Sequence, residues 1–175
     1  MKLSTSIGGW PSAAPLQAKK AESDGYDMVG CGELSHDSML TMALAASQTS
    51  RIELLTSVAI AFPRSPMVLA MEAWDIHQLS GGRFNLGLGS QVKGHNERRF
   101  GGSWSAAAPR MKEYIQMVKA IWASWQEGKP ANFIGKEYRY TLMTPPFNPG
   151  PLEWPQPKIY LAVVGPAMAR VAGEV

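Results

Sequence analysis

The stretch from Thr56 to Gly89 constrains the fold of this 175-residue chain more than any other. It overlaps an apolar, β-branched run, Ile52–Ala61, that is interrupted only by small or short polar residues. Such a run is typical of a strand buried on both faces of a parallel sheet. A helix ending at Leu79 follows it, and Arg83–Leu88 forms the next strand. The stretch therefore predicts one βαβ unit, with two parallel strands joined by a helix.

Residues with special backbone preferences mark the ends of this unit. Ser65 offers a side-chain cap, and Pro66 suits the first helical position because its missing N–H costs no hydrogen bond there. Gly81 and Gly82 supply the positive φ that ends a helix. Gly89, at the exit of the second strand, allows a ligand to come close to the backbone. We therefore expect Gly89→Val to weaken ligand binding without unfolding the protein.

The same patterns predict three further strands and four further helices. The strands are expected at Lys2–Gly8, Tyr26–Cys31 and Lys158–Val164. The helices are expected at Leu16–Ser23, from Asp37 or Ser38 to about Gln48, from about Pro109 to Trp125, and from Ala167 to Val175. Residues 90–105 read as an irregular polar loop, and residues 131–143 as a β-hairpin inserted before the fifth strand. Five strands alternating with helices indicate a parallel α/β fold.

Two architectures compete, an open doubly wound sheet and a (β/α)8 barrel of the TIM type. A dinucleotide-binding open sheet is disfavoured because no Gly-x-Gly-x-x-Gly follows the first strand, and Gly87-x-Gly89 has Val92 in place of a third glycine. A barrel takes about 250 residues. We therefore expect a single incomplete barrel domain over residues 1–175, with about the first five β/α units.

Composition and charge exclude several classes of function. The net charge of +3 is modest and no run of Lys or Arg exceeds two residues, which disfavours a nucleic-acid partner. No apolar run is long enough to span a membrane, and no secretory signal opens the chain. The single cysteine, Cys31, suits a reducing cytoplasm and reads as a buried filler. Scattered Cys, His and carboxylate residues predict no metal site.

Several motifs in this order resemble the bacterial-luciferase-like oxidoreductases. The most specific is Leu79-Ser80-Gly81-Gly82-Arg83-Phe84, and the others are Gly25-Tyr26-Asp27, Arg64-Ser65-Pro66, Gly135-Lys136-Glu137-Tyr138 and Val164-Gly165-Pro166. The resemblance covers essentially the whole chain and is closer to the branch that uses the deazaflavin coenzyme F-420. It implies a (β/α)8 barrel that binds F-420 or FMN across its carboxyl face.

The resemblance also implies where that cofactor is held. A cis peptide between Ser57 and Val58, followed by Ala59, is expected to back the ring. Backbone N–H groups after the fourth and fifth strands are expected to meet the phosphate. These positions are Gly89, Ser90, Gln91, Val92, Gly165 and Pro166. The alternative is that the glycines only make tight strand exits.

Catalytic and substrate-binding residues are implied by the same resemblance. Glu33 matches an acidic position at the end of the second strand, whereas Leu34 stands where many family members carry a histidine. His36, two residues further on, is the candidate to share proton transfer with Glu33, and its alternative role is structural. Trp10, after the first strand, would wall a substrate pocket or pack within its loop.

The resulting hypothesis is an F-420- or FMN-dependent oxidoreductase or monooxygenase that acts on a small organic substrate. Its chemistry would be hydride transfer or, with FMN, oxygen activation. The rival hypothesis is a non-catalytic half-barrel, or a subunit that dimerises to cover its open sheet edges, and a homodimer is the expected assembly. A nicotinamide-dependent dehydrogenase is a third, disfavoured possibility.

Overall fold

The computed structural model describes residues 1–175, which group into two compact units. The first unit contains Met1–Ala59, Glu72–Gly89 and Pro157–Ala162. The second contains Ile60–Met71, Ser90–Gln156 and Val163–Val175. Each unit is therefore assembled from segments that are distant in the sequence.

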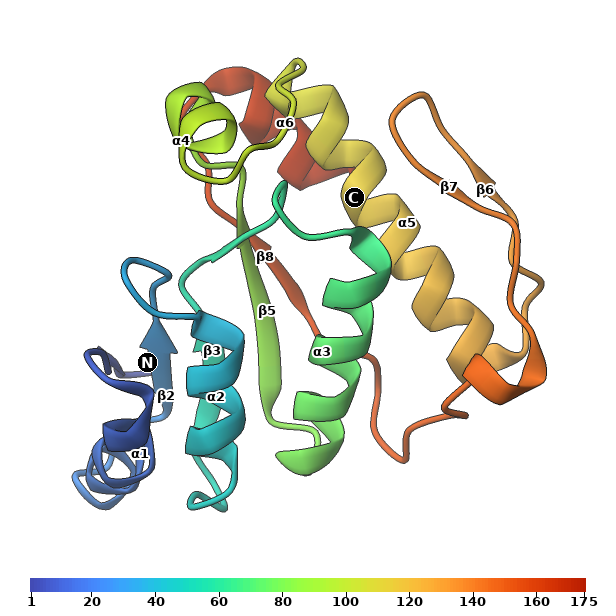
Figure 1. Cartoon of the computed structure of the whole chain (residues 1–175). Helices are drawn as coiled ribbons and strands as arrows, with labels where there is room; N and C mark the ends of the chain where they lie inside the picture. Colours follow the sequence, from blue (N-terminus) through green and yellow to red (C-terminus); the bar gives the residue numbers. More distant parts are fainter. The chain divides into compact units, whose positions relative to one another are not determined.

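A parallel sheet forms the first unit (Figure 1). Its strands are β1 (Ser4–Ser6), β2 (Met28–Cys31), β3 (Glu53–Thr56), β5 (Phe84–Gly89) and β8 (Ile159–Leu161). They lie in the order β1-β2-β3-β5, with β8 paired to β5, and all of these pairings are parallel. The five predicted strands and the parallel α/β class are confirmed.

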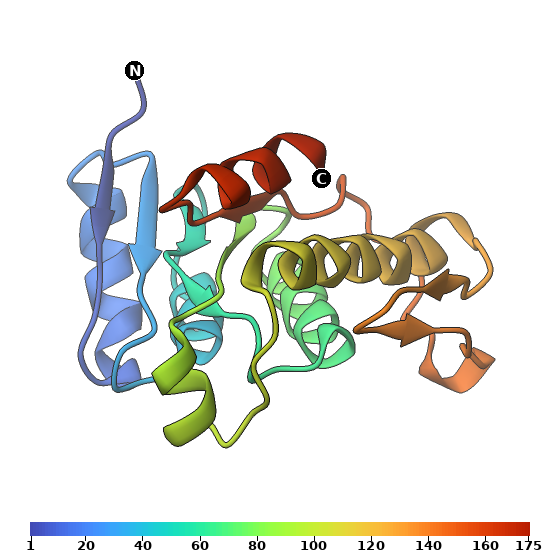
Figure 2. The ribbon, with the colours of Figure 1, turned by 90° about the horizontal axis from the view of Figure 1, so that it is seen from above.

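Helices cover one face of this sheet, and Figure 2 shows α1 and α2 behind β1, β2 and β3. They are α1 (Ala14–Ser23), preceded by the short 3₁₀ helix η1 (Pro11–Ala13), and α2 (Ser38–Ala46). The side chain of Asp37 caps α2 by accepting a hydrogen bond from Leu40 N at 2.9 Å. Val29 and Leu54 are completely buried, whereas Met28 and Leu55, which alternate with them, are half-buried. At β2 and β3 one face of the sheet is thus packed and the other is accessible, whereas β5 is buried along its whole length.

The predicted strand Ile52–Ala61 is shorter than expected. Strand β3 ends at Thr56, the Ser57–Val58 peptide is cis, and a two-residue strand, β4 (Ala59–Ile60), follows. The prediction of one continuous strand was wrong because apolar composition does not reveal a change of backbone direction. Helix α3 (Pro66–Leu79) has the predicted bounds, and Ser65 Oγ accepts from Val68 N at 3.1 Å as its cap.

The second unit is built on α5 (Ala107–Glu127), which ends at Gly128 in the left-handed conformation. Its predicted apolar stripe is buried: Met111, Ile115, Val118, Trp122 and Trp125. Lys112 pairs with Glu174 of α6 (Pro166–Glu174) at 2.7 Å. The predicted hairpin is confirmed as the antiparallel pair β6 (Phe133–Ile134) and β7 (Arg139–Tyr140).

One arginine ties several segments of the second unit together. The Arg110 guanidinium lies 4.3 Å from the centre of the Phe62 ring. It also donates to Tyr138 Oη at 2.8 Å and to the Ser103 carbonyl at 2.9 Å. Burial of the Tyr138 hydroxyl raises its pKa despite this cation. The contact set anchors both the hairpin and the loop before α5 to the helix.

The loop at residues 90–105 is more regular than predicted. It contains a six-residue helix, α4 (Lys93–Arg98), which the sequence does not reveal because the segment has no apolar periodicity and Val92 provides no side-chain cap. The proline-rich segment before β8 contains only the short 3₁₀ helix η2 (Pro145–Phe147), as expected for its composition.

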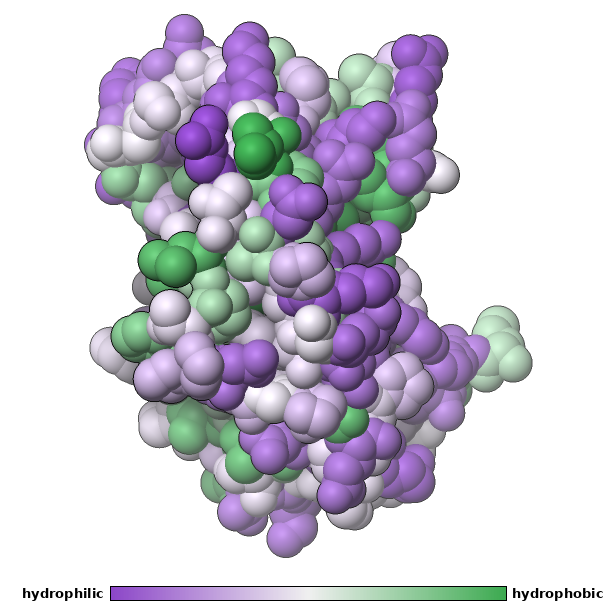
Figure 3. Space-filling view, turned by 90° about the vertical axis from the view of Figure 1, so that its right-hand side faces the viewer, coloured by the Kyte–Doolittle hydropathy of each residue, from purple (hydrophilic) through white to green (hydrophobic).

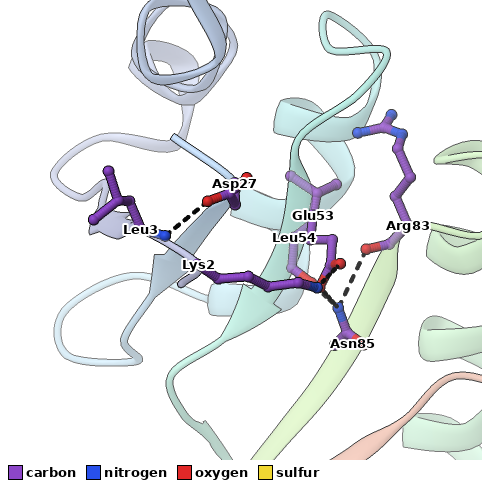
Figure 4. A network of polar contacts seen from close by, with 7 residues as sticks. All are labelled: Lys2, Leu3, Asp27, Glu53, Leu54, Arg83 and Asn85. Atoms are coloured by element: carbon purple, nitrogen blue, oxygen red, sulfur yellow. Dashed lines mark hydrogen bonds and ion pairs between the residues drawn. The ribbon is translucent and has the colours of Figure 1, made fainter. Parts of the chain in front are cut away.

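Polar contacts hold the amino ends of the strands in the first unit together (Figure 4). Lys2 pairs with Glu53 at the start of β3, and Asp27 accepts from Leu3 N at 2.7 Å. The Asn85 side chain lies 3.4 Å from the Arg83 carbonyl, which it bonds. This end of the sheet is therefore occupied by structural contacts.

None of the helices combines the length and the apolar character that a membrane span requires. The face shown in Figure 3 is mostly hydrophilic, and its hydrophobic residues lie in small separate clusters.

Candidate functional site

A hollow of about 510 Å³ lies on the accessible face of the sheet in the first unit. It is lined by Ser4, Thr5, Ser6, Met28, Gly30, Gly32, Leu55 and Ser57. Five of these eight side chains are serine or glycine, so much of the wall is backbone or hydroxyl. Such a wall lets a flat molecule come close to the strands.

Glycines let the exits of β2 and β3 approach each other beside the hollow. A Cβ added at Gly32 would lie 3.2 Å from the Ser57 carbonyl oxygen, and one at Gly30 would lie 3.3 Å from Ser57 Cβ. Backbone bonds join the same segments, since Ser57 N donates to Cys31 O at 2.6 Å. The two strand exits thus form one continuous wall.

The three residues expected to back the ring have different surroundings. Ser57 is exposed and lines the hollow, Val58 is half-buried, and Ala59 is fully buried. The carbonyl of Val58 accepts from Glu33 N at 3.3 Å, which ties this exit to the candidate acid. Ser57 is therefore the one of the three that reaches the hollow.

Gly87 and Gly89 of β5 make close contacts within the protein. A Cβ at Gly87 would lie 1.8 Å from the Thr56 carbonyl oxygen, and one at Gly89 would lie 2.6 Å from Val58 Cγ2. Gly89 is also buried. A valine at this position would have to displace Val58, so Gly89→Val is expected to disturb the packing at the strand exits as well as any ligand contact.

The hydroxyl of Thr56 holds β5 where β3 ends. Thr56 Oγ1 donates to Gly87 O at 2.8 Å and accepts from Gly87 N at 2.9 Å. The side chain is completely buried. The sequence did not single out this residue, because Thr56 lies in the middle of the predicted strand Ile52–Ala61 and not at its predicted end.

The proposed catalytic and substrate residues lie near the exits of β1 and β2. The rings of Trp10 and His36 have centroids 4.7 Å apart and planes 43° apart, and Trp10 is 74% exposed. Glu33 is half-buried, and its Oε2 accepts from Ser38 Oγ at 3.4 Å. The structure thus brings Trp10 and His36 together, whereas none of the three lines the hollow.

The predicted phosphate contacts after β5 belong to the second unit. Gln91 has a φ of 56°, which is uncommon for a residue other than glycine. Val92 N donates to Gln91 Oε1 at 2.9 Å. The side chain of Asn96, which the sequence analysis did not single out, bonds the carbonyls of Ser90 and Val92.

The other predicted phosphate contacts begin α6. Gly165 precedes the helix, no side chain caps it, and a Cβ there would meet no atom within 4 Å. Packing therefore does not require glycine at this position. Pro166 is exposed at the first helical position, as predicted for a helix start.

Other reactive side chains have structural surroundings. Burial raises the pKa of the Cys31 thiol, which favours the unreactive protonated form. His77 is buried, and its Nδ1 lies 2.8 Å from the Phe84 carbonyl oxygen. No group of three or more His, Cys, Asp or Glu side chains could hold a metal ion.

In barrels of parallel strands, ligands bind at the carboxyl ends of the strands, and part of this hollow lies beside the exits of β2 and β3. A family model described as luciferase-like monooxygenase matches residues 6–175. The chain belongs to this family.

The chain spans about half the length of the curated relatives that it matches. An uncharacterised protein of Mycobacterium tuberculosis is 42% identical over 175 residues, which are 100% of this chain and 52% of the relative. A second protein of the same organism, named as a coenzyme F-420-dependent oxidoreductase, is 33% identical over 147 residues, which are 81% of this chain and 42% of the relative.

The fold also matches about half of longer solved structures. An F-420-dependent secondary alcohol dehydrogenase, solved with an F-420–acetone adduct, superposes with a TM-score of 0.80 and 21% sequence identity. The match covers 99% of this chain and 56% of that one. It confirms that the structure corresponds to about half of a luciferase-like barrel.

Proposed function

We propose that this chain binds the coenzyme F-420 ring in the hollow of its first unit and serves hydride transfer to or from a small organic substrate. The observation that carries the proposal is the hollow itself, with its serine- and glycine-rich wall beside the strand exits. Its volume of about 510 Å³ falls within the roughly 300–1,000 Å³ typical of small-molecule sites. The 33% identity to a protein named as a coenzyme F-420-dependent oxidoreductase supports the choice of the deazaflavin over FMN.

The residues around the hollow fit a planar, polar ring. Ser6 and Ser57 present hydroxyl groups, while Gly30 and Gly32 leave backbone accessible. Leu55 supplies apolar contact. When bound, the ring would supply the hydride chemistry, and the protein would supply position and electrostatics.

The remaining predicted site residues receive roles in the same proposal. Glu33 would hold or release a proton, with His36 as the second candidate for that step. Trp10, stacked against His36, would provide an aromatic wall for the substrate. The phosphate contacts predicted through backbone N–H groups at Ser90–Val92 and Gly165 lie in the second unit and stay predictions separate from the ring site.

A titration of the purified chain with F-420 and, separately, with FMN tests the proposal. Absorbance and fluorescence of the cofactor report binding. Ser6→Phe would place a large side chain in the hollow without touching the packed face of the sheet, so we expect it to abolish binding. Ser23→Phe, at an exposed position at the end of α1, is the matched control. Equal affinity of wild type and Ser6→Phe would exclude the hollow as the ring site.

A role in self-association is the second candidate, because the sheet of the first unit has incompletely paired strands. Strand β1 pairs only with β2, and β8 pairs only with β5. Unpaired strand edges favour pairing with another chain, so we propose a homodimer. Sedimentation analysis over a range of concentrations tests this assembly, and a strictly monomeric chain at all concentrations would exclude it. A dimer that binds neither cofactor would favour the non-catalytic alternative.

A further inference from the structure

The side chain of Gln17, on α1, lies at the open edge of β1 where that strand ends. Strand β1 pairs only with β2, and Ile7 N donates to the Gly30 carbonyl at 2.9 Å where this pairing stops. The next residue, Gly8, bonds the Gln17 amide instead. Gly8 N donates to Gln17 Oε1, and Gln17 Nε2 donates to Gly8 O, each at 3.1 Å. The amide therefore supplies both bonds that a further strand would make with Gly8.

This pair of bonds fixes the start of the loop that carries Trp10. Gly9 has a φ of 84°, which favours glycine, and turns the chain between the two residues. The Trp10 carbonyl then accepts from Ala13 N at 2.9 Å, where η1 begins. The backbone of Trp10 is thus held on both sides, through Gly8 and through Ala13.

The side chain of Trp10 is held mainly by its stack on His36. The two ring centroids are 4.7 Å apart and the ring planes 43° apart. Trp10 is 74% exposed, whereas His36 is half-buried. Helix η1 also packs against α2, which begins two residues after His36. The orientation of the two rings therefore depends on where the loop after β1 places the Trp10 backbone.

We propose that Gln17 is a positioning residue for His36: it fixes the exit of β1 so that Trp10 holds the imidazole in one orientation. The inference rests on the proposed function, in which His36 is a candidate for proton transfer and Trp10 an aromatic wall. A group that transfers a proton must lie within hydrogen-bond reach of its target, so the direction of its ring matters. Gln17 acts through the Gly8 backbone, and all of these residues belong to the first unit.

NMR of the His36 ring protons tests the inference without a cofactor, because the indole ring of Trp10 shifts the signals of protons close to its face. The chain has three histidines, so His36→Gln assigns the signals, and Trp10→Ala gives their position without the stack. Gln17→Leu removes both bonds to Gly8, whereas Gln17→Glu keeps only an acceptor for Gly8 N. Lys19→Leu, at an exposed position of the same helix, is the matched control. Spectra are recorded in alkaline buffer, where histidine rings are neutral in every variant.

We expect Gln17→Leu to move the His36 signals most of the way to their position in Trp10→Ala, Gln17→Glu to move them part of the way, and Lys19→Leu to leave them in place. The signals of His77, which is buried in the same unit, report whether the fold is intact. Unmoved His36 signals in Gln17→Leu would overturn the positioning role.

If Gln17→Leu moves the His77 signals as well, the milder Gln17→Glu decides, and unmoved His36 signals in that variant would overturn the role. The cofactor titration is a separate measurement. If wild type binds neither F-420 nor FMN, the proposed function fails, and the NMR result still decides whether Gln17 positions the two rings.

Discussion

Replacing Thr56 by valine should show how strongly its hydroxyl holds the exits of β3 and β5 together. Valine has nearly the same shape as threonine but lacks the hydroxyl. Thr56 is 0% exposed, and both of its hydrogen bonds go to the backbone of Gly87. The substitution therefore removes two buried hydrogen bonds and changes the packing little.

The expected loss of unfolding free energy follows from the backbone groups that lose their hydrogen-bond partner when Thr56 is replaced. Leu86 N bonds Lys158 O, and Leu88 O accepts from Ala162 N, so these neighbours in β5 turn their backbone groups toward β8. The backbone groups of Gly87 face the other way, and both of them bond the hydroxyl of Thr56. Each buried group left unpaired costs about 1–3 kcal/mol, and we expect Thr56→Val to lower the free energy of unfolding by about 2–4 kcal/mol. Thr56→Ser keeps the hydroxyl and should cost only about 1 kcal/mol for the lost methyl group.

Urea unfolding followed by circular dichroism measures both variants, with the denaturant slope checked so that a change in midpoint reports stability. The informative quantity is the difference between the valine and serine variants, because both change the same site. If Thr56→Val is no more destabilising than Thr56→Ser, the two hydrogen bonds between the Thr56 hydroxyl and the Gly87 backbone do not contribute to stability, which would refute this prediction.

Three further predictions concern structural residues. Burial raises the pKa of Glu22, but hydrogen bonds from the backbone N–H groups of residues 50–52 outweigh it and leave the pKa lowered. Its stabilising effect is therefore present above the unfolded pKa and lost as the pH falls through the lower folded pKa. Glu22→Gln should cost about 1–2 kcal/mol in urea unfolding at pH 7, and this cost should shrink steadily as the pH is lowered below the ordinary pKa of a glutamate. Arg110→Lys should lower stability by about 1–2 kcal/mol, because lysine cannot both stack on a ring and donate to Tyr138 as a guanidinium does; an unchanged melting temperature would contradict this. Cys31 should react with a thiol reagent at pH 8 at the rate of a free cysteine only after denaturation, and fast labelling of the native protein would show that its thiol is accessible.

The order of the elements was predictable because local signals repeat along the chain. Helix α3 has the predicted bounds, since Ser65 caps its start and a pair of glycines ends it. Helix α5 was predictable from one buried apolar stripe. Helix α4 was not, because it is short, polar and uncapped, and it depends on contacts such as those of Asn96 rather than on a pattern in its own residues.

The candidate site was less predictable because its shape depends on how neighbouring strands end. The run Ile52–Ala61 reads as one strand, yet pairing through β3 stops at Thr56, where the side-chain hydroxyl takes over the bonds that a further strand residue would make. This close approach of the two strands requires glycine at position 87, because any Cβ there would overlap the Thr56 carbonyl oxygen. The chain then turns, and Ser57 reaches the hollow instead of continuing the ladder. A glycine and a threonine that look unremarkable in two separate strands thus shape the wall of the site together, and only their juxtaposition in the sheet reveals it.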